Sequence, residues 1–316
     1  MDVYSSVIVT GTMAYDEIMD FPGKFVDYFH PEKLHQINIS FVVSRLEKEL
    51  GGTATNIAYN LFLATQSLQK KITITPIASV GKDGQKLIDF FRKNNISTKG
   101  ILRDRRLYTA TGKVITDKKD NQIWGYYYGA SKSATKINSK EFSNSKSVWI
   151  ISANHPDAFL HFQNQVIINN NTYIYDPGMS LTWIKDKDLK QGVMNAQYLV
   201  GNDYEIAMII KRLNISINQL IDTGINAITT LGEKGVRYES KSEKLEVKSY
   251  QVKKIIDPTG AGDAWRGGFI AGIVCRLPIK TCLKLGNVMA SFAIEMYGTV
   301  NHRPTTKEIA KRLKSL

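Results

Sequence analysis

Short apolar runs alternate with helical patterns along most of the chain. The apolar runs are rich in Val, Ile, Thr and Tyr, and several end in Gly or Asn, which is typical of strands. These predicted strands are 6–11, 72–81, 147–152, 172–178, 196–202 and 225–232. Predicted helices lie among them at 56–66, 85–94, 203–213 and 261–275. The alternation indicates βαβ units, so we expect an α/β fold whose mainly parallel sheet has helices on both faces.

Two segments interrupt this alternation. Residues 12–50 contain no clear crossover helix, and residues 101–130 have the pattern of successive strands with a turn at 117–121. In folds of this class, ligands bind beyond the carboxyl ends of the strands, and an inserted sheet can cover that edge. We therefore predict a small β lid of residues 12–50 and 101–130. The predicted α/β core comprises residues 1–11, 51–100 and 131–316.

The composition is that of an ordinary globular protein. Of 316 residues, 43% are hydrophobic and 22% are charged. No run of about eighteen apolar residues is present, and the N-terminus has the pattern of a first strand rather than a signal peptide. We therefore expect a cytoplasmic protein without a membrane partner. In that compartment Cys275 and Cys282 are expected to be reduced thiols, with a disulfide or redox pair as the alternative.

The net charge of +13 allows two interpretations. A basic protein can bind nucleic acid, but here Lys and Arg are spread along the chain among acidic residues. Only the tail 307–316 concentrates them, with Ile309, Leu313 and Leu316 at the spacing of an amphipathic helix. We therefore favour solvated charge over a nucleic-acid surface, and we expect the positive field to attract an anionic small molecule.

The most informative stretch is DPTGAGDAWRGGF, residues 257–269. It joins a predicted strand end at 253–257 to a predicted helix, so its glycines lie at a helix N-terminus. Backbone N–H groups there lack intrahelical partners and carry the positive end of the helix dipole. Gly260, Ala261 and Gly262 are therefore candidate donors to a phosphoryl group. The stretch is neither a P-loop, since no Lys-Ser/Thr follows the glycines, nor a dinucleotide fingerprint.

Asp263 would repel a phosphate if binding were the only task of this turn. A carboxylate in that place is useful when it takes a proton from a hydroxyl that attacks the phosphate. We therefore interpret Asp263 as a general base, and the N–H groups of Gly260, Ala261 and Gly262 as donors that stabilise the transferred charge. The alternative is an Asp that only caps the helix.

The same stretch resembles the C-terminal signature of the ribokinase-like, or PfkB, family of carbohydrate and nucleoside kinases. GTMAYDEIMDFP and GGTATNIA resemble two earlier family segments, which implies that Asp16, Gly51, Gly52 and Asn56 bind the substrate. The resemblance covers nearly the whole chain. It implies a Rossmann-like core with a β lid, as the alternation does. It also implies ATP and Mg²⁺ as cofactors and, as in some relatives, a monovalent cation near Asp257 and Thr259.

The resemblance extends to the nucleotide side. NDYE at 202–205 matches the family's N-x-x-E motif, which implies phosphate placement by Asn202 and Mg²⁺ binding by Glu205 through water. TTLGEKG at 229–235 implies that Thr230, Gly232 and Gly235 bind ATP, and Asn287 falls where the family has an Asn near the adenine. Taken singly, each residue has a structural alternative: a turn, a strand end or, for Asn202 and Glu205, a capping box.

Three features favour a nucleoside as the acceptor. Arg266 after Asp263, and the lid-return segment 116–132, are similar to prokaryotic adenosine and nucleoside kinases, and the double-glycine segment lacks the lysine usual in sugar-specific ribokinases. We therefore predict an ATP-dependent kinase acting on the 5′-hydroxyl of adenosine or a broader set of purine ribonucleosides. A sugar kinase of the same family is the alternative, and a non-catalytic, basic nucleic-acid-binding protein is the third hypothesis.

The second lid segment also supplies aromatic side chains. Trp124, Tyr126, Tyr127 and Tyr128 lie close together in the sequence, and strand alternation allows only one set of them to face a ligand. They serve either a nucleobase or the packing of the lid or of a subunit interface. The sequence does not determine the oligomeric state, but free edges of a lid sheet often pair, so a homodimer through the lid is one assembly that it allows.

Overall fold

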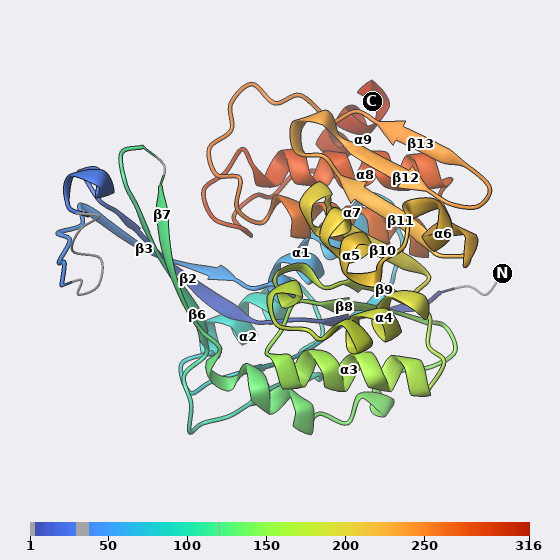
Figure 1. The fold of residues 1–316 in the computed structure, drawn as a ribbon, viewed down its shortest axis with the longest axis horizontal. Coiled ribbons are helices and arrows are strands. Elements are labelled where there is room, and N and C mark those ends of the chain that lie inside the picture. The colour runs from blue at the N-terminus through green and yellow to red at the C-terminus, as the bar shows by residue number, and fades with distance from the viewer. Residues whose placement is uncertain (1–3, 30–37, 120) are drawn as a thin grey trace.

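The computed structural model describes residues 4–29, 38–119 and 121–316 (Figure 1). Residues 1–3, 30–37 and 120, which fall within the predicted core and lid ranges, lie outside the described part. Two sheets organise the described chain, one of nine strands and one of four. The large sheet and its helices form the main body, and the small sheet stands out at its side (Figure 1). The predicted α/β fold with a small β lid is confirmed.

The large sheet is parallel over most of its width. From one edge to the other its strands are β13 (Lys244–Val247), β12 (Val236–Glu239), β11 (Asn226–Thr230), β10 (Tyr198–Asn202), β9 (Tyr173–Asp176), β8 (Ser147–Ser152), β1 (Ser6–Thr10), β4 (Thr73–Val80) and β5 (Ile101–Arg103). All pairs from β5 to β11 are parallel, whereas β12 and β13 form an antiparallel hairpin at one edge. The carboxyl ends of the parallel strands therefore share one rim.

Helices cover both faces of this sheet. They are α1 (Thr53–Ser67), α2 (Gln85–Lys93), α3 (Pro156–Ile168), α4 (Asp186–Met194), α5 (Asp203–Leu213), α6 (Ile217–Asp222), α7 (Ala261–Val274), α8 (Ile279–Ala293) and α9 (Thr306–Ser315). Strand alternation divides the core between the faces. Val7 and Val9 pack with α1, α2, α7, α8 and α9, while Ile8 between them packs with α3, α4, α5 and α6.

The small sheet, called here the lid sheet, has the strand order β3-β2-β6-β7. Its strands are β2 (Ala14–Asp20), β3 (Arg45–Gly51), β6 (Ala110–Thr116) and β7 (Gln122–Tyr127). The predicted turn between β6 and β7 is present. Asp117 N–H donates to Asn121 O at 3.0 Å, and Asp117 Oδ1 accepts from the backbone N–H groups of Lys119 and Asn121. A carboxylate that satisfies loop N–H groups in this way fixes the hairpin.

The structure corrects two predicted boundaries. The predicted strand end at 253–257 is wrong, because the backbone N–H groups of Ile256 and Asp257 donate to Ile294 O just beyond α8 instead of to a strand. Ile255 and Ile256 are more than half exposed, so this apolar run is not a core strand. The predicted lid range 101–130 includes β5, which pairs with β4 in the large sheet. In this second segment the lid sheet begins at Ala110.

Four helices were not predicted from the sequence pattern: α3, α4, α6 and α8. In α8, Gly286 and the polar residues Thr281, Asn287 and Ser291 weaken the intrinsic helical preference. Close packing on α7 compensates for this loss. A Cβ on Gly268 would lie 2.6 Å from Leu285 O, and one on Gly272 would lie 2.8 Å from Cys282. Both cysteines are free thiols, as predicted, with Cys282 buried and Cys275 half-buried.

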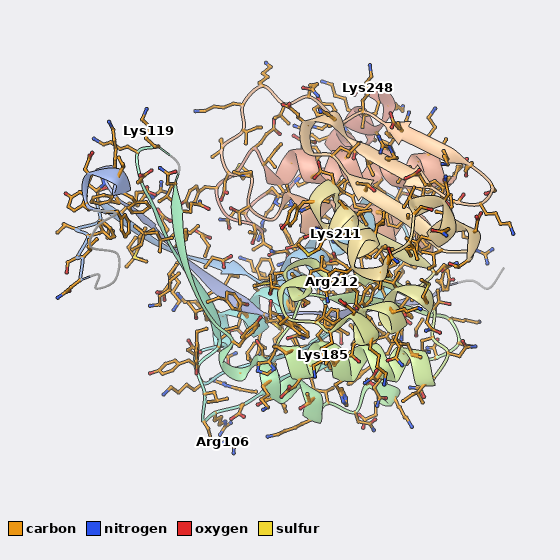
Figure 2. All side chains as sticks on the ribbon, viewed as in Figure 1. Arg106, Lys119, Lys185, Lys211, Arg212 and Lys248 are labelled. Atoms are coloured by element: carbon orange, nitrogen blue, oxygen red, sulfur yellow. The ribbon has the colours of Figure 1, made fainter. Side chains whose placement is uncertain are left out.

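Basic side chains are distributed over the whole molecule (Figure 2). The labelled ones come from several parts of the chain: Arg106 before β6, Lys119 in the β6–β7 turn, Lys185 before α4, Lys211 and Arg212 in α5, and Lys248 after β13. Several are balanced by acids, as in the pairs Arg106–Asp104 and Arg212–Asp186. The predicted tail helix is α9, which buries Ile309 and exposes most of its charges. Within the described ranges, no helix is long and apolar enough to cross a membrane.

Candidate active site

Two neighbouring cavities open at the rim formed by the carboxyl ends of the strands. The first, of ≈ 590 Å³, is lined by the last residues of β9, β10 and β11 and by the first turns of α5 and α7. The second, of ≈ 600 Å³, lies between the β11–β12 turn, the loop 249–255 and α8. Thr230, Gly232 and Gly262 line both cavities, so the two spaces adjoin at the start of α7. This is the place where folds of this class bind ligands.

The glycine turn forms the N-terminus of α7, as predicted. Gly260 is the N-cap residue, with φ of 77° in the left-handed region. A Cβ there would lie 2.8 Å from the Thr299 side chain, so both conformation and space require glycine. Ala261 N–H makes one long bond, 3.3 Å, to Pro258 O. The first-turn N–H groups of α7 lie beside both cavities and can bind an anion there.

Asp263 lies in the first turn of α7 and lines the first cavity. Asn56 of α1 donates from Nδ2 to Asp263 Oδ2 at 2.8 Å, and Asn56 Oδ1 accepts from Thr299 Oγ1 at 2.7 Å. Asn56 is buried, so this chain of hydrogen bonds fixes the carboxylate. Burial raises the pKa of Asp263 to about 7, against the lowering effect of Arg266. The residue is therefore poised to exchange a proton near neutral pH.

The double glycine lets the start of α1 approach the lid sheet. Gly52 is the N-cap of α1, with φ of 89°, and a Cβ there would lie 2.5 Å from Thr12 O. A Cβ on Gly51 would lie 2.0 Å from Asp16 Oδ2. Any larger residue at 51 would displace the Asp16 carboxylate. The structure thus brings together Asp16, Gly51, Gly52 and Asn56, the four predicted substrate residues.

Asp16 lies on β2, directly opposite Glu49 on β3 and Gly112 on β6. Burial raises the pKa of its carboxyl to about 6, and the charges of Asp257 and Glu49 add to this effect. Tyr126 lies opposite Gly112, so its ring shares the face of Asp16. The ring of Tyr126 packs edge-on against Tyr128 at 5.1 Å. The site side of the lid therefore combines one carboxylate with aromatic surface.

Asn202 and Glu205 form a reciprocal capping box at the start of α5. Asn202 N–H donates to Glu205 Oε2, and Glu205 N–H donates to Asn202 Oδ1, both at 2.8 Å. The structural alternative considered for this pair is thus present. Both residues also line the first cavity, and burial raises the pKa of Glu205, with a further contribution from Asp176. The box holds the Glu205 carboxylate at the cavity wall.

The remaining predicted residues line the second cavity. Gly232 has φ of 58°, and Gly235 has φ of 102° with its Cβ position 2.0 Å from Val247 O. These glycines allow the tight β11–β12 turn beside Thr230. Asn287 Oδ1 accepts from Trp265 Nε1 at 2.9 Å, and its Nδ2 donates to Lys248 O at 2.8 Å. Asn287 therefore joins α7 to the loop that follows β13 and forms part of the wall.

Residues 13–306 match the pfkB family carbohydrate kinases. The chain belongs to this family. It is thus a phosphotransferase with a hydroxyl acceptor, and the predicted family is confirmed. A nucleoside kinase of Methanocaldococcus jannaschii is 28% identical over 92% of this chain and 94% of its own.

Solved structures give a similar picture. A Burkholderia thailandensis nucleoside kinase in complex with inosine has a TM-score of 0.86 and 26% identity, covering 98% of this chain and 97% of that one. The same enzyme in complex with ADP-inosine has a TM-score of 0.83 and 26% identity, covering 98% and 95%.

Two residues that line the first cavity were not predicted as site residues, although Arg266 served as a sign of a nucleoside acceptor. Arg266 of α7 and Asp176 of β9 form a buried ion pair, with Nη2 and Oδ1 separated by 2.5 Å. Ser152 donates to the other oxygen of Asp176. The sequence feature that could have indicated Asp176 is its place at the end of a buried strand, at the rim where ligands bind. The pairing itself joins residues 90 positions apart and depends on the fold.

Proposed function

We propose that the protein transfers the γ-phosphate of ATP to the 5′-hydroxyl of a ribonucleoside. The observation that carries this proposal is the Asp263 carboxylate. It lies at a helix N-terminus suited to a phosphoryl group, is held by Asn56, and has a pKa raised to about 7. On its lid side are Asp16 and Gly51, and on its other side is the cavity lined by Asn202, Glu205 and Thr230.

The reaction follows from this placement. As the 5′-oxygen forms its bond to the γ-phosphorus, the hydroxyl proton passes to Asp263. The bond from the γ-phosphorus to the oxygen that bridges to the β-phosphate breaks, and ADP leaves with that electron pair. The N–H groups of Gly260, Ala261 and Gly262 stabilise the negative charge that spreads over the transferred group.

We assign the second cavity to the adenosine part of ATP and the first to its phosphates. Loop 249–255 and Asn287 wall the second cavity, while the first lies beside the α7 turn. The carboxylate oxygens of the first cavity suit Mg²⁺, which prefers oxygen ligands. In the described part of the chain no group of three or more His, Cys, Asp or Glu could hold a metal. Mg²⁺ is usually bound by substrate phosphates, water and one or two carboxylates.

Glu205 is the carboxylate that we assign to Mg²⁺, through water. Bound there, the ion would neutralise charge on the phosphates. We also propose a monovalent cation near Asp257 and Thr259. Thr259 N–H and Gly298 N–H donate to the two oxygens of Asp257, which fixes this carboxylate behind the α7 turn. The need for ATP and the two reduced thiols favour the cytoplasm as the compartment.

Asp16 supports a ribose-containing acceptor. A carboxylate accepts hydrogen bonds from two neighbouring hydroxyls, and the 2′- and 3′-hydroxyls of ribose form such a pair. Tyr126 and Tyr128 offer apolar surface for a base on the same side. The two relatives named above are nucleoside kinases, and one was solved with inosine. We therefore favour a purine nucleoside, adenosine included, over a free sugar.

We further propose a homodimer through the lid sheet. Its outer face carries an apolar cross-strand row, Leu46–Met19–Ile115–Ile123. Leu46 is 64% exposed and Ile123 is 40% exposed, so a second copy would bury apolar surface there. Sedimentation of the wild type and of Leu46→Lys tests this assembly. A wild-type monomer at micromolar concentration would contradict it.

Product analysis tests the proposed activity. The purified protein is incubated with Mg-ATP and, separately, adenosine, inosine, cytidine, ribose and fructose. We expect a nucleoside 5′-monophosphate, whose phosphorus resonance is split into a triplet by the two 5′ protons. Phosphorylation of ribose or fructose alone would replace the proposal with a sugar kinase. Absence of turnover with all five, together with steeply salt-dependent RNA binding, would favour a nucleic-acid-binding protein.

A further inference from the structure

The first cavity, which we assign to the phosphates of ATP, is lined by more acidic than basic side chains. Four carboxylates line it: Asp176, Asp203, Glu205 and Asp263. Among the described residues of this lining, Arg266 is the only Lys or Arg. Phosphate oxygens entering the cavity therefore meet one cationic side chain, apart from any bound metal ion. Its position decides what it can do there.

Arg266 is three residues after Asp263 and four after Gly262 on α7, so the three share one side of the helix. Its side chain is only 9% exposed. Nη2 is bound to Asp176 at 2.5 Å, and Ser152 holds the second oxygen of that carboxylate. The guanidinium is therefore fixed in one orientation before any substrate binds. A cation fixed in advance costs no reorganisation during the reaction.

Gly262 makes room for this arrangement. A Cβ at position 262 would lie 2.9 Å from Arg266 Nη1. Because Gly262 has no side chain, Nη1 can lie against the first turn of α7. The N–H groups of this turn are the proposed hydrogen-bond donors to the phosphoryl group. Nε of Arg266 is buried and has no hydrogen-bond partner among the residues that the structure describes. A buried donor without a partner is costly, and such groups in native proteins often mark a functional site.

We propose that Arg266 is a further catalytic residue, whose guanidinium contacts the oxygens of the transferred phosphoryl group while Asp176 holds it in place. The inference rests on the proposed function. The guanidinium undergoes no covalent change. It neutralises charge on the phosphoryl oxygens while the 5′-oxygen–phosphorus bond forms, the bond to ADP breaks and Asp263 receives the proton.

Kinetics of R266Q, R266K and a matched control test this role. The control is R212Q, because Arg212 also forms an ion pair, with Asp186, but does not line the cavity. Loss of one preorganised donor typically lowers kcat by about 10²–10³-fold, so we expect R266Q to lose that much, with KM for both substrates within threefold. R212Q should keep its kcat. A loss of less than tenfold in R266Q would overturn the proposal.

A second measurement separates catalysis from folding. Aluminium fluoride, added to ADP, Mg²⁺ and adenosine, mimics the transferred phosphoryl group and should raise the Tm of the wild type beyond ADP and adenosine alone. R266Q should lose this increment and keep the shift by ADP and adenosine. Persistence of the increment would refute the assignment. If R266Q does not fold, R266K decides, because a Lys cannot contact Asp176 and the phosphoryl group together.

For R266K, a kcat lowered tenfold or more supports the role, and an unchanged kcat overturns it. The wild type must first phosphorylate a nucleoside. If it phosphorylates only a sugar, the proposed function fails, and the Arg266 variants are compared with that sugar instead. Arg266 is proposed to contact the phosphoryl group that ATP donates, so its role can be tested with either acceptor. Failure of the proposed nucleoside activity is therefore distinguishable from failure of the proposed role of Arg266.

Discussion

At the residue scale, we expect the protonation of Asp263, the proposed base, to set the pH range of activity. A base must be deprotonated to accept a proton, and burial raises the pKa of this carboxyl to about 7. The kcat/KM for adenosine should therefore reach a plateau above pH 7, fall about tenfold per pH unit between 7 and 6, and fall more steeply below 6, where Asp16 is protonated as well. Steady-state kinetics between pH 5 and 9 measure this profile. A flat profile down to about pH 5 would exclude Asp263 as the titrating base.

Asp16 gives a second prediction at this scale. Its pKa of about 6 leaves the carboxylate ionised at pH 7.5. Hydrogen bonds to a charged group contribute ~1.5–3 kcal/mol each, so Asp16→Ala should raise the nucleoside KM roughly a hundredfold. The KM for ATP should barely change. The mutant should treat adenosine and 2′-deoxyadenosine alike, whereas the wild type should prefer adenosine. An equal loss for ATP and adenosine would mean that Asp16 does not bind the sugar.

The sequence indicated which single residues line the two cavities better than it indicated their contacts. Asp263 and the glycines follow from one local turn, and the double glycine follows from a loop before a helix. The hydrogen bond between Asn56 and Asp263 joins residues 207 positions apart in the sequence. Thr299, whose hydroxyl bonds to Asn56 Oδ1, lies in a segment that carries no motif. Arg266 appeared in the sequence as a family resemblance only. Its ion pair with Asp176 required the three-dimensional structure.

At the element scale, Glu205 completes the capping box at the start of α5, and we propose that it also binds Mg²⁺ through water. Gln also serves in capping boxes, so Glu205→Gln should keep the helix start and change stability by less than about 1 kcal/mol. It removes the charge that we assign to Mg²⁺. Turnover should fall, and higher Mg²⁺ should restore part of it. Glu205→Ala, the control, loses the cap as well. Equal turnover of wild type and Glu205→Gln at all Mg²⁺ concentrations would refute the metal role.

Elements were predictable from sequence where the pattern was local. Every strand and helix predicted from the alternation is present, apart from the strand end at 253–257. That apolar run is exposed beside α8, and hydrophobicity alone cannot reveal the difference. The helix α8 went unpredicted because its stability comes from close contact with α7 across Gly268 and Gly272. The edge hairpin β12–β13 does alternate between apolar and polar residues, but each strand has only four residues, too few for a distinct pattern.

At the scale of the whole molecule, His302 joins the C-terminal segment to α1. Nε2 of its buried ring contacts Asn60 Oδ1 at 2.7 Å, so Nε2 carries the proton. Nδ1 has no hydrogen-bond partner within the described residues. Burial lowers the pKa of His302 from 6.5 to about 4. The folded state thus keeps this ring neutral where the unfolded chain would bind a proton.

This linkage predicts an acid-dependent loss of stability. Between pH 6.5 and 4 the unfolded state gains a proton at His302 that the folded state does not, so stability falls by up to roughly 3 kcal/mol. His302→Gln keeps an amide donor for Asn60 and does not titrate. The difference in unfolding free energy between the two proteins, from urea titrations at pH 7 and 4.5, isolates the effect. The same difference at both pH values would exclude it.

The central claim of this account is that Asp263 takes the proton of the attacking hydroxyl. The most direct measurement is kcat of Asp263→Asn, with substrate binding measured alongside. The amide preserves the size of the side chain and cannot act as a base. General base catalysis contributes ~10²–10⁴-fold, so kcat should fall at least a hundredfold while adenosine and ATP still bind. A variant that keeps more than about a third of the wild-type kcat would contradict the claim, because that loss is under 1 kcal/mol of barrier.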